Sequence, residues 1–280
     1  MTTKTIDGKT YLIGKPLIFP QYQGKEYGLA VQSLMNEMIR DCAIELLAQI
    51  GGTADSPFLE RIQRILNFLL KKWENKFLEK LPFLASRMVL GVDKASSIAI
   101  NSSLKEISKD ISISPSFLME GSNRPLFEAE ITKNVNLFKT IPTEFFSEVQ
   151  DTIIKSTVQG RGLADLVPYF QKFTNSDYHP HTFHKNYAYN RALDQTRKAY
   201  QSINTMRSQK TGSDYFRWQH SGGSPDPDPR HVALHNKIFK FDEPPVIWIR
   251  KGEEVRGYPA ERPNCRCTMS ICFKVGDRFV

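Results

Sequence analysis

The strongest constraint on the fold is a change in the spacing of apolar residues near Gly212. Before this point, apolar residues recur every three or four positions, as on one face of a helix. After it, short runs of β-branched and aromatic residues alternate with glycine, proline and aspartate. The chain is therefore predicted to be α+β, with a mainly helical N-terminal body and a small C-terminal α+β module.

The helical pattern divides into segments that end at glycine or proline. Gly51-Gly52 is expected to end the first helix and Pro82 the second, and Gly160 fits the left-handed position that follows a helix. Helices are predicted at residues 26–50, 57–80, 85–107, 128–138, 142–159, 163–173 and 181–209.

The remaining segments are predicted to be extended or irregular. Residues 2–25 are rich in glycine and proline and are expected to form an extended arm, with one short strand at residues 11–13. Strands are expected at residues 215–220 and 268–273, a short helix at 230–234, and loops over 242–262. The predicted organisation is an arm (1–25), a helical body (26–180) and a C-terminal module (181–280).

Charge is unevenly distributed along the chain. The net charge is +8, and residues 179–280 hold 17 Lys+Arg against 10 Asp+Glu, a net of +7. This asymmetry indicates a polyanionic partner near the C-terminal end, or a basic solvated surface.

Targeting and cysteine patterns point to a protein made in the cytoplasm. The N-terminal residues lack the apolar core of a secretory signal, and no segment reaches the roughly 20 apolar residues of a membrane span. There are four cysteines, at positions 42, 265, 267 and 272. In a reducing compartment they are not expected to form disulfides.

The last third of the chain carries three groups of residues in a specific order. They are a long helix containing Asn190-Arg191-Ala192-Leu193, then Trp218 followed by Asp228, Arg230, His231 and Leu234, and finally Cys265-Arg266-Cys267. Together they resemble the Mu F-like minor head protein family of tailed phages. The specific part of this resemblance covers about residues 190–273, and the helical region matches more weakly.

The resemblance implies a structural role in the phage head and no enzymatic activity. Family members act in head assembly near the portal vertex, which implies portal, capsid and scaffold proteins as partners, with no membrane. The expected location is the virion, in the capsid interior or at the portal vertex. Contact with packaged double-stranded DNA, without base reading, is a further expectation.

One departure from the family pattern concerns a turn. Where the family usually has Asp-Gly after the His-x-x-Leu motif, this chain has His235-Asn236. Asparagine is the next best residue for a left-handed turn, so the backbone is expected to be retained. The missing carboxylate weakens any catalytic or metal role at position 235.

His231, Cys265 and Cys267 are candidate zinc ligands, since thiolate and imidazole suit that ion. The Cys-x-Cys spacing is unusual for zinc, and the fourth ligand would be Cys272, His235 or His220. The alternative is that no metal binds and that both cysteines pack as small apolar residues, with Arg266 pointing outward.

Residues in this region are also compatible with two other functional classes. Asp226, Asp228 and His231 have the residue types of a metal-dependent nuclease, or of a toxin-like effector delivered with the genome. The prolines between these acids instead favour a rigid turn with an aspartate cap. The second class is a general nucleic-acid-binding protein of the host cell. The candidates for DNA contact, in a head protein or in this second class, are Arg191, Arg197, Lys198, Arg207 and Lys210, unless they form a solvated helix face.

Overall fold

The computed structural model describes residues 2–6, 8–50, 56–108, 121–173, 186–222 and 226–276. It divides the chain into two compact units, each assembled from segments that are distant in sequence. Unit 1 consists of residues 1–24, 88–128 and 194–280, and unit 2 consists of residues 25–87 and 129–193. The predicted α+β class is confirmed, whereas the division differs from the arm, body and module that the sequence indicated.

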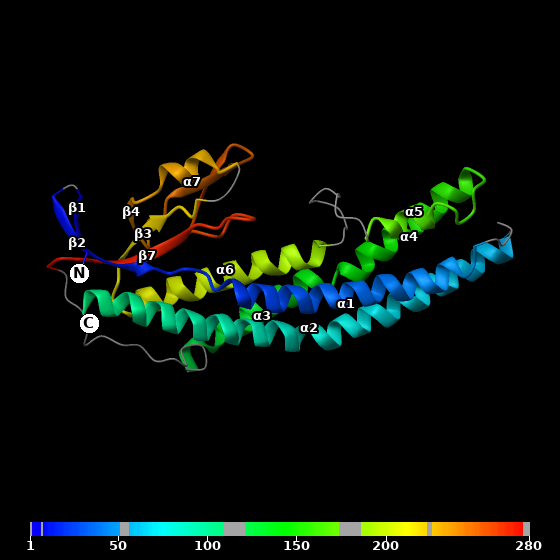
Figure 1. Cartoon of the computed structure of the whole chain (residues 1–280), viewed down its shortest axis with the longest axis horizontal. Helices are drawn as coiled ribbons and strands as arrows, with labels where there is room; N and C mark the ends of the chain where they lie inside the picture. The colour runs from blue at the N-terminus through cyan, green and yellow to red at the C-terminus, as the bar shows by residue number, and fades with distance from the viewer. Residues whose placement is uncertain are drawn as a thin grey trace. The chain divides into compact units, whose positions relative to one another are not determined.

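Helices supply the regular structure described in unit 2 (Figure 1). The long helices that enter it also contribute residues to unit 1, and none of the described helices combines the length and apolarity of a membrane span. The helices are α1 (Gln21–Leu47), α2 (Ser56–Ile107), α3 (Arg124–Phe138), α4 (Ile141–Val158), α5 (Leu166–Gln171) and α6 (Tyr187–Lys210).

The prediction that Pro82 ends a helix is wrong. Helix α2 continues through Pro82 and joins the two helices expected at 57–80 and 85–107 (Figure 1). Proline removes one backbone donor, so the carbonyl of Leu78 loses its usual partner four residues later. Both Leu78 and Pro82 lie on exposed positions, where water can replace that donor.

Within unit 2 the apolar spacing largely predicts what is buried. Leu34, Met38 and Leu46 of α1 are buried, whereas Leu29 is 64% exposed. Asp41 of α1 accepts hydrogen bonds from two side chains of α2, Lys72 at 2.8 Å and Trp73 at 2.7 Å. Polar contacts therefore join these two helices at the edge of their apolar interface.

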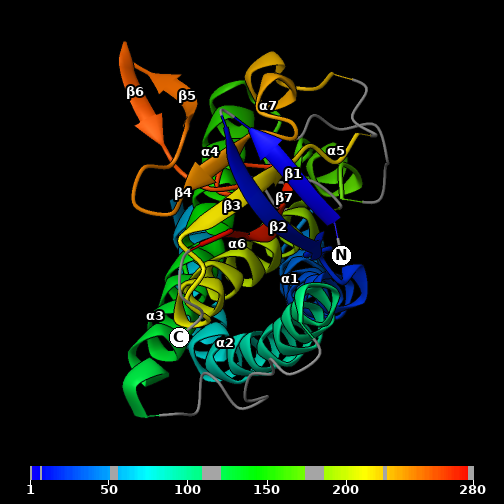
Figure 2. The same cartoon turned by 90° about the vertical axis from the view of Figure 1, so that its left-hand side faces the viewer.

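Unit 1 contains an antiparallel sheet in the order β1-β2-β7-β3-β4 (Figure 2). Its strands are β1 (Thr2–Ile6), β2 (Lys9–Pro16), β3 (Tyr215–Gln219), β4 (Ile238–Lys240) and β7 (Thr268–Lys274). The N-terminal segment is therefore not a separate arm. Ile13 pairs with Cys272 and Tyr11 with Lys274, so β2 places the start of the chain beside its C-terminal strand.

Alternation along the strands gives the sheet two different faces. Phe216, Trp218 and Met269 lie on one face, in a buried cluster with Ile100 and Leu104 of α2. Tyr11, Ile13 and Cys272 form a smaller buried cluster with residues packed around them. Because neighbouring residues of a strand point to opposite faces, Cys272 lies on the face opposite to Met269 and Ile271. The sheet therefore separates Cys272 from the residues that pack against those two side chains.

A hairpin occupies the region predicted as loops. Strands β5 (Val246–Arg250) and β6 (Glu253–Arg256) pair as a two-stranded sheet. Lys251 and Gly252 between them have φ values of 51° and 87°, which suits a two-residue hairpin turn. The β-branched and aromatic run Val246-Ile247-Trp248-Ile249 was the available sequence signal for this strand.

Candidate functional site

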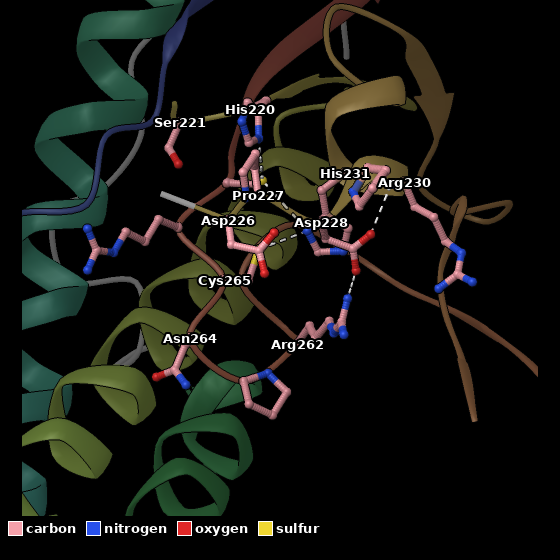
Figure 3. Close-up of a pocket in the computed structure, with 14 residues that line it drawn as sticks. His220, Ser221, Asp226, Pro227, Asp228, Arg230, His231, Arg262, Asn264 and Cys265 are labelled. Carbon is pink, nitrogen blue, oxygen red and sulfur yellow. Dashed lines mark hydrogen bonds and ion pairs between the residues drawn. The ribbon is translucent and has the colours of Figure 1, made fainter. Parts of the chain in front are cut away.

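A hollow of about 680 Å³ lies in unit 1. Three segments line it: the end of β3 with His220, the helix α7 (Pro229–Ala233) with the residues before it, and residues 262–267 before β7. Figure 3 shows His220, His231 and Cys265 around this hollow. The motif residues that are distant in sequence therefore meet here.

Asp228 fixes the start of α7. Its carboxylate accepts a hydrogen bond from the backbone N–H of Arg230 at 2.9 Å, and Pro229 follows in the first turn. Arg262 forms an ion pair with the same carboxylate (Figure 3). The predicted aspartate cap is confirmed, and Arg262 is a partner that sequence reasoning missed.

His231 is buried and held on two sides. Its Nε2 lies 3.1 Å from the carbonyl oxygen of Ile247, and its ring meets the Trp218 ring edge-on at a centroid distance of 5.3 Å. A carbonyl oxygen only accepts hydrogen bonds, so Nε2 carries the hydrogen. The lone pair of neutral His231 is therefore on Nδ1.

Both thiols of the Cys-Arg-Cys segment approach that nitrogen. His231 Nδ1 is 3.4 Å from Cys265 Sγ and 3.8 Å from Cys267 Sγ. The ligand atoms of these three buried residues all lie within 4.8 Å of one another. On the other side, Cys267 Sγ is 3.6 Å from Nδ1 of His220. The structure thus brings the three predicted zinc ligands together, with a second imidazole beside them.

The two thiols differ in acidity. Hydrogen bonds from Cys267 and from His231 lower the pKa of the Cys265 thiol to about 4, although burial opposes its ionisation. The hydrogen bond to Cys265, together with burial, raises the pKa of Cys267. The hydrogen bond with Cys265 also raises the pKa of His231 above its usual value. Without a bound cation the cluster therefore favours ionised Cys265, which accepts a hydrogen bond from the Cys267 thiol and, when His231 is protonated, another from Nδ1–H of that ring.

The other motif residues divide between core and surface. Trp218 is fully buried, and the half-buried Leu234 packs against the same cluster. Arg230 and Arg266 are exposed and line the hollow. Cys265 and Cys267, which flank Arg266, are both buried, so Arg266 points away from the core.

The candidate DNA-binding side chains do not form one exposed row. Arg207 must be withdrawn, because its side chain is buried and donates to Asp93, to the carboxylate at 2.7 Å and to the backbone carbonyl at 2.6 Å. Lys198 is 16% exposed and pairs with Asp194 at 2.8 Å.

The remaining candidates are also engaged with protein groups. The guanidinium of Arg191 lies over the Tyr187 ring at 5.0 Å, and that of Arg197 lies over Phe19 at 5.5 Å. Lys210 is exposed and donates to Asn123 and, at 3.2 Å, to Ser122. The basic side chains of α6 therefore make contacts within the protein, and their spacing along the helix does not by itself indicate a phosphate-binding surface.

Residues 181–185 of the helix predicted at 181–209 lie outside the described residues, and α6 is described from Tyr187 to Lys210. Another contact of α6 was not predicted: the Asp194 carboxylate accepts a hydrogen bond from the backbone N–H of Asn264 at 2.8 Å. Asn264 has a φ of 60°, immediately before Cys265. This contact helps to hold the Cys-Arg-Cys segment.

Comparison with known protein families finds one match, over the second half of the chain. A family model described as "Phage Mu protein F like protein" matches residues 147–270. No curated protein and no solved structure matches the chain. The matched residues include Trp218, α7 with its capping Asp228, and Cys265-Arg266-Cys267. Through residues 147–270, the chain carries a phage Mu protein F-like region, and the resemblance indicated by its motifs is confirmed.

Proposed function

We propose that the chain is a head morphogenesis protein of a tailed phage or prophage and a minor component of its virion. The observation that carries this proposal is the family match over residues 147–270. Within that region the motif residues form buried contacts, a helix cap and the wall of a hollow. Motif residues that mainly stabilise the fold are more typical of a structural protein of an assembly than of an enzyme.

The proposed protein partners are the portal protein and the capsid or scaffold proteins. Support comes from large apolar side chains that unit 2 leaves in solvent, among them Leu29, Phe68 and Phe83, which are 64%, 68% and 62% exposed. Exposed aromatic and aliphatic groups of this size favour a protein interface. The proposed location is therefore the inner side of the head, near the portal vertex.

Double-stranded DNA is the proposed non-protein partner, bound through phosphates without base reading. Arg230 and Arg266 support this proposal, because both are exposed at the hollow and neither forms an ion pair with any residue that the structure describes. They replace Arg207 as candidates. Each phosphate neutralised would contribute about −0.9 to the slope of log affinity against log salt.

The rival nuclease proposal receives less support from the geometry. The Asp228 carboxylate caps α7 and pairs with Arg262, and Nδ1 of His231, the nitrogen that could act as a base, faces the thiols of Cys265 and Cys267 at 3.4 and 3.8 Å. These contacts occupy the groups that a nuclease would need for a cation and a general base. Divalent-metal-dependent DNA nicking that is lost in His231→Ala would favour the nuclease over the head protein.

Loss of the chain from its phage tests the proposed function. A stop codon early in its gene should abolish infectious particles, leaving aberrant or empty heads, and the wild-type chain supplied from a plasmid should restore them. A truncation at residue 211 is less informative, because it removes β3 and β7 from the sheet of unit 1. Normal yields of infectious particles from the stop-codon phage would overturn the proposal.

A further inference from the structure

We propose that Cys265, Cys267 and His231 bind one zinc ion, with His220 as the fourth ligand, in a closed structural site. These residues come from three segments: the end of β3, the helix α7 and the loop that leads into β7. The ion would therefore join three separate segments of unit 1. This inference does not depend on the role of the protein in a phage head.

The distances between the ligand atoms agree with tetrahedral zinc. Zn–S bonds near 2.3 Å and Zn–N bonds near 2.0–2.1 Å place a sulfur and a nitrogen about 3.6 Å apart at the tetrahedral angle. The observed separations are 3.4 and 3.8 Å from His231 Nδ1 to the two sulfurs, and 3.6 Å from His220 Nδ1 to Cys267 Sγ. The side chains are thus spaced as they would be around an ion.

Outer contacts orient the ligands in the manner of metal sites. The hydrogen bond from His231 Nε2 to the Ile247 carbonyl fixes the ring and directs the Nδ1 lone pair toward the thiols. Nε1 of Trp218 is buried, and no acceptor of the described residues meets hydrogen-bond geometry with it. The indole N–H lies close enough to the Cys267 thiol to interact with it. A zinc-bound Cys267 thiolate would give the indole hydrogen an acceptor.

The structure discriminates among the three candidates for the fourth ligand. Cys272 pairs with the N-terminal strands on the other face of the sheet and donates to the Ser270 carbonyl at 3.6 Å. His235 is exposed, and its Nδ1 accepts a hydrogen bond from the His220 backbone N–H at 3.1 Å. Only His220 of these three presents a ring nitrogen to one of the two sulfurs.

Ligand chemistry and burial select zinc in a structural role. Two thiolates and two imidazoles at a tetrahedral site are typical of structural zinc, whereas oxygen ligands would suit magnesium or calcium. Three of the four ligands are buried, and the fourth closes the position that a catalytic zinc would leave to water.

Metal content and spectroscopy of the full chain test this proposal. Protein purified from zinc-supplemented cells should contain one equivalent of zinc by mass spectrometry of the metal. Replacement by Co²⁺ should give the visible bands of a tetrahedral site and a sulfur-to-cobalt charge-transfer band. X-ray absorption at the zinc edge should show two sulfur and two nitrogen neighbours.

Matched variants separate the site from a general effect on folding. Cys265→Ser, Cys267→Ser and His231→Ala should each lose the zinc and the charge-transfer intensity, and His220→Ala should weaken zinc binding at least tenfold. Cys272→Ser, a buried thiol outside the site, and His235→Ala, an exposed imidazole, should retain one equivalent. A chelator that removes zinc should lower the melting temperature of the wild-type protein. The same chelator should leave the melting temperature of the Cys265→Ser variant unchanged.

Wild-type protein without bound zinc, or with affinity weaker than micromolar, would overturn the site even if the variants fail to fold. Zinc retained by the Cys265→Ser/Cys267→Ser double variant would overturn the ligand assignment. An absorption spectrum with oxygen in place of the second nitrogen would overturn the role of His220 and the closed structural site.

Discussion

Trp218 and His231 meet edge to face, with ring centroids 5.3 Å apart and planes inclined at 70°. Trp218 lies on the sheet face that packs on α2, and His231 lies on the wall of the hollow. The core of unit 1 and its cluster of thiols and imidazoles are therefore continuous. A substitution of Trp218 in the core should therefore also alter the position of the His231 ring in the cluster.

Trp218→Ala should lower the free energy of unfolding by about 3–5 kcal/mol, because a fully buried indole leaves a large cavity. It should also weaken zinc binding, since the His231 ring loses its neighbour. Urea titration followed by circular dichroism measures the first effect and zinc competition the second. Trp248→Ala, at a half-buried indole, is the control and should cost less. Equal losses for the two variants would contradict the assigned role of Trp218.

Arg207→Met should destabilise the protein by about 3–5 kcal/mol, because it leaves the Asp93 carboxylate buried without its guanidinium. Arg124→Met breaks an exposed helix pair with Glu128 and should cost only about 0.5 kcal/mol. Chemical denaturation of both variants gives the comparison. DNA affinity per folded molecule should be unchanged by Arg207→Met, and a reduced salt dependence would return Arg207 to the DNA-binding set.

Asp41 gives a stability contribution that depends on pH. Burial alone would raise the pKa of its carboxyl, but hydrogen bonds from Lys72 and Trp73 hold that pKa below the usual 3.8. A lowered folded-state pKa stabilises the protein above about pH 4, and the contribution is lost as pH falls through the folded value.

Asp41→Asn should therefore cost about 1 kcal/mol at neutral pH and progressively less below pH 4. Thermal unfolding measured from pH 7 to pH 3 follows this difference. Asp151→Asn, at an exposed carboxylate of α4, is the control for the loss of one negative charge. A deficit for Asp41→Asn that stays constant down to pH 3 would rule out this linkage.

The proposed DNA contact predicts a change in salt dependence. Arg230→Gln combined with Arg266→Gln should reduce the steepness of log affinity against log salt by about 1.8, which is two phosphate contacts. Fluorescence anisotropy with a double-stranded oligonucleotide at several salt concentrations measures the slope. Arg64→Gln with Lys71→Gln removes two exposed cations of α2 and serves as the charge-matched control. Identical slopes for both double variants would exclude a specific phosphate contact at the hollow.

Local signals predicted the helices and several turns well. Gly160 and Asn236 have φ values of 73° and 63°, so both left-handed positions were correctly expected. Pro82 was misread because a proline on an exposed helix position can be accommodated within a long helix. The N-terminal strands were underestimated because β2 pairs with β7, which joins residues more than 250 positions apart, and no local pattern records such a pairing.

The site was predicted in part for a similar reason. His231, Cys265 and Cys267 were expected to lie together on residue type alone, and the structure places them so. The choice of His220 as the fourth ligand required the position of β3 in the sheet, because His220 directly follows the last residue of that strand. Burial of Arg207 could not be predicted either, since its partner Asp93 lies 114 residues earlier on another helix.

The most direct test of the proposed function is quantitative mass spectrometry of proheads and mature particles purified from the source phage or induced prophage. A minor head protein should be present in both, at a few copies per particle, and should remain after washes that remove loosely bound proteins. Absence of the chain from both kinds of particle would contradict the proposed role in the head.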